Sequence, residues 1–132
     1  MKFLTLREKL GRPECPYLER WVLNLYFVSF RIHHWISGDD DRCFHDHPWW
    51  FLTIILKGSY VDYSERGREY LSAGCVRWRP ALHRHTVEVP EGGCWTFLIT
   101  GRQIRRWGFW LKGYKFVKSN KYFLEHGHHP CK

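Results

Sequence analysis

Nine histidines occur in this 132-residue chain, and six of them stand in three His-x-His patterns. Two of the patterns, His45/His47 and His83/His85, lie close to a proline at the start of a predicted strand. On a β-strand, residues i and i+2 point to the same face, so two such imidazoles can bind one metal ion. A third ligand must then come from another strand. The two patterns together predict a metal site built from both segments.

The remaining histidines are weaker candidates. His33 and His34 are adjacent, so on a strand they point to opposite faces and cannot both bind one ion; we expect them to be structural. His126, His128 and His129 stand in a polar segment near the end of the sequence. There, a function and an adventitious metal site are equally consistent with the residues.

The segments that carry the paired histidines have the pattern of short β-strands. Apolar, β-branched and aromatic residues fill runs such as 43–58 and 94–100, and 21–36 reads as extended structure. Glycine-bearing turns such as 73–74 and 90–93 separate the runs, at about the 8–12-residue spacing of sandwiches and barrels. No amphipathic helix of three turns is expected after residue 20. The fold class predicted from these patterns is all-β, a sandwich or barrel.

We expect one domain, which is typical for this length. An N-terminal arm or short helix is expected over residues 1–20, followed by the all-β domain over 21–118. A basic, histidine-rich tail is expected over 119–132. Residues 101–132 hold eight of the 21 Lys and Arg residues against Glu125 alone, so this end carries most of the net charge of +8.

Composition excludes several classes of protein. Aromatic residues make up 18% of the chain, which excludes disordered and coiled-coil classes. The most apolar run, 49–56, is far shorter than the roughly 20 residues of a membrane-spanning helix. The charged start does not resemble a signal peptide, so we expect a cytoplasmic protein. Five cysteines without a Cys-x-x-Cys pair predict reduced thiols rather than a disulfide framework or a cysteine zinc site.

The first histidine segment resembles the first motif of the cupin superfamily. In the string HDHPWWFLTIILKG, His45 and His47 match the His-x-His of that motif, and Gly58 matches its closing glycine. The motif also has a carboxylate, but Trp50 and Phe51 stand at the corresponding positions here.

The second histidine segment resembles the second cupin motif. In GCVRWRPALHRH, Gly74 matches the opening glycine, Pro80 the proline, and His85 the metal-binding histidine. The motif ends in asparagine, where this chain has Val89. The resemblance covers residues 17–117. Within the superfamily, this part of the chain is similar to a group of small cupins from bacteria and their phages.

The resemblance implies a double-stranded β-helix, the cupin jelly-roll barrel. It also implies a divalent transition metal on His45, His47 and His85, like the three-histidine iron site of thiol dioxygenases. Fe(II) is the expected ion; zinc, nickel, manganese and copper stay open because imidazole alone does not select among them. Three neutral imidazoles would leave open positions on the ion for water, substrate or oxygen.

Strand alternation extends the predicted site along the first segment. If His45 and His47 point inward, the residues that share their face are Trp49, Phe51 and Thr53. The opposite face, with Leu52 and Leu56, is also apolar and must be covered by the N-terminal arm or by a second subunit. We therefore expect a homodimer.

Arginines near the second motif are the expected ligand-binding residues. These are Arg77, Arg79, Arg84 and Arg106. A guanidinium can grip a carboxylate or phosphate with two hydrogen bonds, and Trp78 and Trp107 could stack on a flat ligand. The alternative is an ordinary solvated basic face.

Two functions follow as expectations. The first is a metal-dependent, dioxygenase-like enzyme acting on a small anionic substrate, with His83 preferred over Glu88 as the general base. The second is a cupin without catalytic activity that binds or sequesters a small anionic ligand such as a nucleotide. A nucleic-acid accessory role for the basic end, residues 101–132, ranks last because no binding motif accompanies its charge.

Overall fold

A computed structural model describes residues 3–38, 44–111 and 115–118, which form β-strands and no helix. The strands are β1 (Leu4–Arg12), β2 (Cys15–Asn24), β3 (Ser29–Trp35), β4 (Phe44–His45), β5 (Phe51–Ser64), β6 (Gly67–Ser72), β7 (Val76–Arg79), β8 (His85–Glu88), β9 (Cys94–Thr100), β10 (Gly108–Leu111) and β11 (Lys115–Lys118). The all-β jelly-roll prediction is confirmed. Within these ranges no helix is long and apolar enough to cross a membrane.

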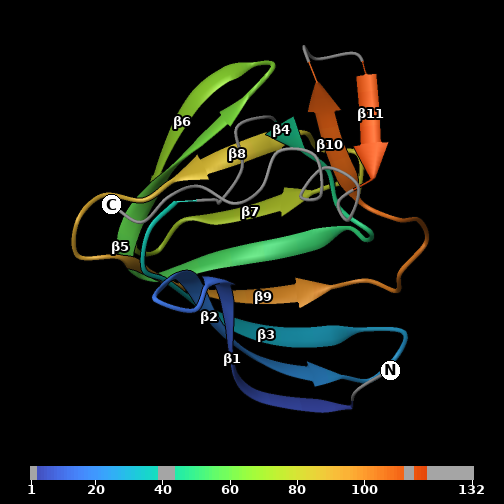
Figure 1. Ribbon diagram of the computed structural model, residues 1–132, viewed down its shortest axis with the longest axis horizontal. Coiled ribbons are helices and arrows are strands. Elements are labelled where there is room, and N and C mark those ends of the chain that lie inside the picture. Colours follow the sequence, from blue (N-terminus) through green and yellow to red (C-terminus); the bar gives the residue numbers. More distant parts are fainter. Residues whose placement is uncertain (1–2, 39–43, 112–114, 119–132) are drawn as a thin grey trace.

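The strands form two antiparallel sheets that share β5 and curl toward each other (Figure 1). Sheet A contains β1, β2, β3, β9 and β7 together with residues 51–58 of β5. Sheet B contains β6, β8, β4, β10 and β11 together with residues 59–64 of β5. Strands far apart in sequence therefore become neighbours, and β8 lies between β5 and β4.

Strand β5 passes from one sheet to the other at Gly58. The residue has a φ of 84°, in the left-handed region that favours glycine. A Cβ atom at this position would overlap the backbone carbonyl oxygen of Gly93. The glycine is therefore required at the point where the barrel folds over, which is the physical reason for the closing glycine of the first motif.

The N-terminal segment differs from the expected arm or helix. Residues 4–12 and 15–24 form the hairpin β1–β2, and β2 pairs with β3 from Leu18↔Trp35 to Asn24↔Ser29. The expected extended segment over 21–36 is also interrupted, because a turn at residues 25–28 joins β2 to β3, with Leu25 N donating to Val28 O at 2.9 Å. Long-range pairing, which local propensity does not report, determines both outcomes.

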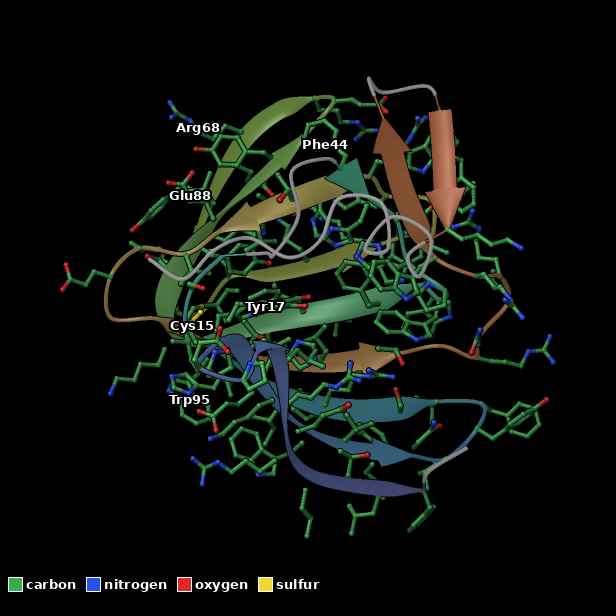
Figure 2. The ribbon with its side chains drawn as sticks, in the orientation of Figure 1. Cys15, Tyr17, Phe44, Arg68, Glu88 and Trp95 are labelled. Atoms are coloured by element: carbon green, nitrogen blue, oxygen red, sulfur yellow. The ribbon has the colours of Figure 1, made fainter. Side chains whose placement is uncertain are left out.

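The outer face of sheet A is apolar across five strands. Register places two outward rows side by side: Trp78, Leu52, Ile99, Phe30 and Leu23 in one, and Val76, Ile54, Phe97, Ile32 and Trp21 in the other. Trp95, labelled in Figure 2, extends this face. Its ring stacks on that of Trp21 at 5.8 Å and on that of His34 at 4.2 Å. Trp78 is 57% exposed, and the β1–β2 hairpin continues sheet A at its edge rather than covering it.

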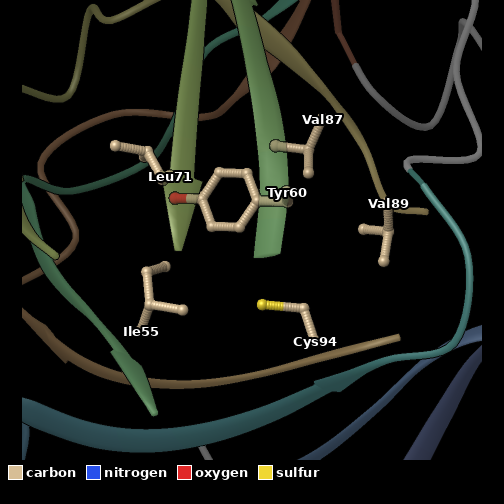
Figure 3. Close-up of a cluster of buried hydrophobic side chains, with 6 residues drawn as sticks. All are labelled: Ile55, Tyr60, Leu71, Val87, Val89 and Cys94. Carbon is tan, nitrogen blue, oxygen red and sulfur yellow. The ribbon is translucent and has the colours of Figure 1, made fainter. Parts of the chain in front are cut away.

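The hydrophobic core lies between the two sheets. Its buried members are Ile55, Tyr60, Leu71, Val87, Val89 and Cys94. Side chains from sheet A, Ile55 and Cys94, face the ring of Tyr60 from sheet B (Figure 3). Tyr60 and Val87 also line the cavity above this cluster, so the core serves as the floor of the barrel.

The cysteines follow the expectation in part. Cys75 and Cys94 are free thiols, and burial raises the pKa of Cys94 to about 11. The expectation of reduced cysteines is wrong for Cys15, which is disulfide-bonded. Disulfide formation depends on distances within the fold, which spacing along the sequence does not report.

Candidate metal centre

The two histidine motifs meet where β4 pairs with β8. His45 lies directly opposite His85 in this antiparallel pair, and residues in such a position have Cβ atoms about 5 Å apart. The backbone N–H of His47 donates to the carbonyl of Ala81 at 2.9 Å, which fixes the first motif to the loop before β8. Figure 2 marks the two strands by Phe44 on β4 and Glu88 at the far end of β8.

The three side chains converge on one point. One nitrogen from each of His45, His47 and His85 lies within 4.8 Å of the others. The Nε2 atoms of His47 and His85 are 3.1 Å apart. All three residues are buried, with at most 9% of their surface exposed. The sequence-predicted ligand set is thus brought together in the folded chain.

Asp62 binds the Nδ1 side of His85, opposite the Nε2 atom that faces the other histidines. It lies on β5, is 3% exposed, and its Oδ2 accepts a hydrogen bond from His85 Nδ1 at 2.8 Å. Burial alone would raise the pKa of Asp62, but hydrogen bonds from His83 and His85 outweigh it and hold the pKa well below its usual range. Because the Nδ1–H group of neutral His85 donates its hydrogen bond to the carboxylate, the Nε2 atom that faces the centre is unprotonated.

Asp46, between the two histidines of the first motif, fixes the surrounding backbone. It is fully buried; Oδ1 accepts from Gly108 N at 2.9 Å, and Oδ2 accepts from Trp110 Nε1 at 2.9 Å. Arg105 forms an ion pair with it at 2.6 Å. These contacts tie β10 and the preceding loop to the histidine pair, so Asp46 positions the site without pointing into it.

The donor set fits a divalent transition metal. Burial first, and then the neighbouring histidines, hold the pKa of His47 well below 6.5. Burial also lowers the pKa of His85 to about 4, although Asp62 opposes this. The Nδ1 atom of His47 is buried and has no hydrogen-bond partner among the described residues. Neutral imidazoles that converge in this way offer nitrogen lone pairs to a cation.

A cavity of about 400 Å³ opens beside the histidines. All three lie on its wall, together with Trp49, Phe51 and Thr53. The ring of His47 lies 4.5 Å from that of Phe51 and 5.9 Å from that of Trp49. All three residues lie beside His47 as expected, but the predicted strand over 43–58 is interrupted: β4 ends at His45 in sheet B and β5 begins at Phe51 in sheet A.

His83 and the predicted arginines lie elsewhere. His83 Nε2 is 3.4 Å from Asp62 Oδ2 and does not line the cavity, so it is placed to support Asp62 rather than to meet a substrate. Arg77 and Arg79 pair with Glu69, and Arg84 pairs with Glu65 while covering the ring of Trp110 at 4.0 Å. Arg106 lines a second, outer cavity. Arg77 and Arg79 lie opposite Thr53 and Phe51 on the inner face of sheet A, but their guanidinium groups reach carboxylates of sheet B instead of lining the cavity. Arg79 also lies 3.7 Å from Asp62 Oδ2.

Sequence reasoning missed the arginines that do line the cavity, Arg20 and Arg31. Arg20 lies in the segment expected to be an arm. Arg31 alternates with Phe30 and Ile32, and an amphipathic pattern favours the apolar side as the buried one. The available signal was the spacing of Arg31 from His33, since both share one face.

Solved structures with a similar fold include cupin domains. A cupin-2 domain from Rhodospirillum rubrum matches with a TM-score of 0.65 at 14% identity, over 83% of this chain and 76% of that chain. A variant of Streptomyces PAC13 with uridine matches with a TM-score of 0.61 at 9% identity, over 87% and 89%. Fe(II) HppE matches with a TM-score of 0.57 at 12% identity, over 71% and 56%. No protein-family model and no curated protein matches this chain.

Proposed function

The chain has the cupin fold, and on this premise we propose that it is a metal-dependent enzyme acting on a small anionic substrate inside the barrel. The observation that carries the proposal is the convergence of three buried histidine nitrogens within 4.8 Å on the wall of a cavity. A buried cluster of neutral imidazoles beside a cavity is the arrangement of a catalytic metal site with open coordination positions.

His45, His47 and His85 would hold the ion. A bound divalent ion supplies Lewis acidity, and iron(II) adds redox chemistry toward oxygen. Iron is the ion we favour, supported by the similarity to Fe(II) HppE and by the three-histidine donor set. Zinc, nickel and manganese are the alternatives.

The protein's own residues orient the ligands and shape the substrate site. Asp62 keeps the Nε2 atom of His85 unprotonated, and Asp46 holds the first motif against β10. Trp49 and Phe51 provide apolar walls that exclude water, and the Thr53 hydroxyl is a hydrogen-bonding group on the same wall. The substrate class that these walls accept is small and partly flat.

Metal content is the test of this proposal. Tag-free protein purified without nickel or chelator is expected to contain about one equivalent of metal, and the double variant His45→Ala/His85→Ala none. His34→Ala is the matched control, because His34 faces outward on Trp95. Circular dichroism verifies that each variant is folded.

Iron in the wild-type protein would direct the next assay to oxygen consumption with candidate anions. Wild-type protein without metal after growth in iron-, zinc-, nickel- and manganese-supplemented media would overturn the proposal. Equal metal content in the wild type and the folded double variant would overturn the ligand assignment.

A cupin without catalytic activity that binds an anion is the second candidate. The observation that favours it is the absence of aspartate and glutamate from the described cavity lining, which leaves no carboxylate to act as a general base on a substrate. The match to PAC13 with uridine supports a nucleoside-like ligand. Retained ligand affinity in metal-free His45→Ala protein, with no turnover of the ligand, would favour this function over the first.

Three other expectations stay proposals. We propose a homodimer through the outer face of sheet A, supported by the exposed apolar side chains of Trp78, Val76 and Leu56. We keep the cytoplasm as the proposed location, which the disulfide at Cys15 does not favour. A nucleic-acid contact through the basic end is the last; its segment 119–132 lies outside the described residues.

A further inference from the structure

The cavity has a second polar wall, formed by sheet A. On this wall Arg20 of β2 is paired with His33 of β3, and His33 is paired with Thr96 of β9. Arg31 lies two residues before His33 and therefore points to the same side. All four residues line the cavity that the metal centre also borders. The substrate space thus lies between histidines from sheet B and a cationic row from sheet A.

Arg31 has no carboxylate partner among the described residues. Its Nε donates to the Ser29 hydroxyl at 3.2 Å, and its guanidinium lies 4.8 Å from the ring centroid of Trp49. Arg20, in contrast, forms an ion pair with Glu8 at 2.8 Å. Burial and then the charge of Arg20 lower the pKa of Arg31 to about 10. The Glu8 carboxylate opposes this shift without pairing with Arg31, and a half-buried cation without a paired carboxylate is stabilised when an anion binds it.

Two neighbouring polar groups also lack partners. Both ring nitrogens of His33 and the hydroxyl of Thr96 lack a hydrogen-bond partner among the described residues. His33 is 7% exposed and Thr96 fully buried, so bulk water is not their partner. Buried polar groups in native proteins are nearly always satisfied, and such exceptions point to a ligand, ion or water at the position.

A second cavity next to the first has the same charge. Arg31 and Trp49 border both the inner cavity and the outer cavity, and the outer cavity is also lined by Arg102, Arg105 and Arg106. No aspartate or glutamate lines either cavity in the described ranges. A cleft lined by one sign of charge raises the local concentration of ligands of the opposite sign.

We infer that Arg31, together with Arg20 and His33, forms an oxyanion subsite on sheet A that binds the carboxylate or phosphate of the substrate. Arginine binds either group through a planar pair of N–H donors. Trp49 lies between this subsite and His47, so the substrate is an anion whose flat or apolar body packs along Trp49 toward the metal centre. The substrate orientation rests on the proposed metal site, whereas binding of the oxyanion does not.

Calorimetric titration of metal-free protein tests the subsite. Two matched pairs of probes distinguish the sources of the anion: uridine 5′-monophosphate against uridine, and benzoate against benzamide. Wild-type protein is expected to bind the anionic member of at least one pair about tenfold or more tightly than the neutral member. Arg31→Gln is expected to abolish this preference.

Arg77→Gln is the matched control, because Arg77 pairs with Glu69 outside both cavities and its loss should leave the preference intact. If Arg31→Gln does not fold, Arg31→Lys keeps the charge but not the fork and should show a partial loss. A preference retained undiminished in a folded Arg31 variant, or no preference in the wild type for either pair, overturns the inference.

Metal content of the same variants separates this inference from the proposed function. Arg31→Gln should bind as much metal as the wild type. A wild-type protein that takes up no metal but loses its anion preference in Arg31→Gln would sustain the subsite while the metal-dependent function fails.

Discussion

The two walls of the cavity differ in how their polar groups are partnered. On sheet B, Asp62 accepts hydrogen bonds from His85, and Asp46 accepts from Gly108 and Trp110. On sheet A, both nitrogens of His33 and the Thr96 hydroxyl lack a partner among the described residues, whereas among the three converging histidines only Nδ1 of His47 does. We call the side with His45, His47 and His85 the histidine wall and the side with Arg20, Arg31 and His33 the arginine wall. Hydrogen bonds hold the histidine wall in one orientation before a ligand binds, whereas the arginine wall has buried polar groups that only a ligand would satisfy.

This difference teaches which charge each wall is suited to receive. Preorganised neutral imidazoles backed by a carboxylate suit a cation. Unpartnered cationic and polar groups suit an anion, since leaving a buried polar group unsatisfied costs about 1–3 kcal/mol that a bound ligand can recover. The predictions below test whether the walls differ in this way, from the largest expected effect to the smallest.

Loss of Asp46 should cause the largest effect, because it removes a buried acceptor from the histidine wall. Asp46→Ala leaves the partly buried Arg105 and the Trp110 N–H without their acceptor, and should lower the free energy of unfolding by about 3 kcal/mol. Urea denaturation measures this change. Glu69→Ala is the control: Glu69 also pairs with arginines but is 43% exposed, so about 1 kcal/mol or less is expected. Equal losses in the two variants would contradict the prediction.

Loss of the Asp62 carboxylate charge should weaken metal binding while leaving the three ligands in place. Asp62→Asn is expected to lower metal affinity by about 10- to 100-fold, because His85 loses the acceptor that fixes its tautomer. Competition with a chromophoric chelator measures the affinity. Glu69→Gln, outside the cavity, should leave it unchanged. An unchanged affinity in Asp62→Asn would show that the histidine wall does not depend on its carboxylate support.

Acid should destabilise the folded protein through His33, which lies on the arginine wall. Burial, followed by the charges of Arg31 on its own strand and Arg20 on β2, lowers the pKa of His33 to about 3, against 6.5 in an exposed chain. Below pH 6.5 the unfolded state binds a proton that the folded state excludes. The free energy of unfolding should therefore fall as the pH drops from about 6.5 to about 3, by up to about 1.4 kcal/mol per pH unit.

His33→Phe removes this contribution, so metal-free variant protein should lose stability less steeply over that pH range than metal-free wild type. Denaturant titrations at several pH values compare the two slopes. Because His47 and His85 are present in both proteins, the difference isolates His33. Identical slopes would show that His33 is not held neutral by the fold.

The outer face of sheet A should affect association more than folding. Trp78→Ser/Leu56→Lys replaces exposed side chains of β7 and β5 and should shift a dimer toward monomers with little change in monomer stability, since surface substitutions are usually worth about 0.5 kcal/mol. Sedimentation velocity over a concentration series measures the shift. A wild-type protein that is monomeric throughout would refute the dimer.

Much of the fold and part of the site could be predicted from the sequence. A two-residue period places Phe51 and Thr53 on one face of β5, and both line the cavity. His47 and Trp49 line the same cavity although they lie between β4 and β5, outside any strand. The predicted turns at 73–74 and 90–93 correctly indicated where β7 and β9 begin. The β1–β2 hairpin was missed because its strands depend on pairing with β3, and residues 1–20 carry no strong local strand signal.

The arginines show where the same reasoning fails. Arg77 and Arg79 stand near the second motif in sequence, yet β7 turns their side chains toward Glu69. Arg31 is distant from both motifs in sequence, yet its strand borders the cavity. Charge density along the chain reports neither the face on which a side chain lies nor the strand that lies opposite.

The sequence by itself determined the strand-rich fold, the two histidine motifs and the glycine at position 58, because residue type and period act locally. Only the tertiary structure decided that His45 lies opposite His85, that Asp62 supports His85, and that Arg31 shares their cavity. These relations join residues far apart in the chain. They exist only once sheet pairing has closed the barrel and set the register of every strand.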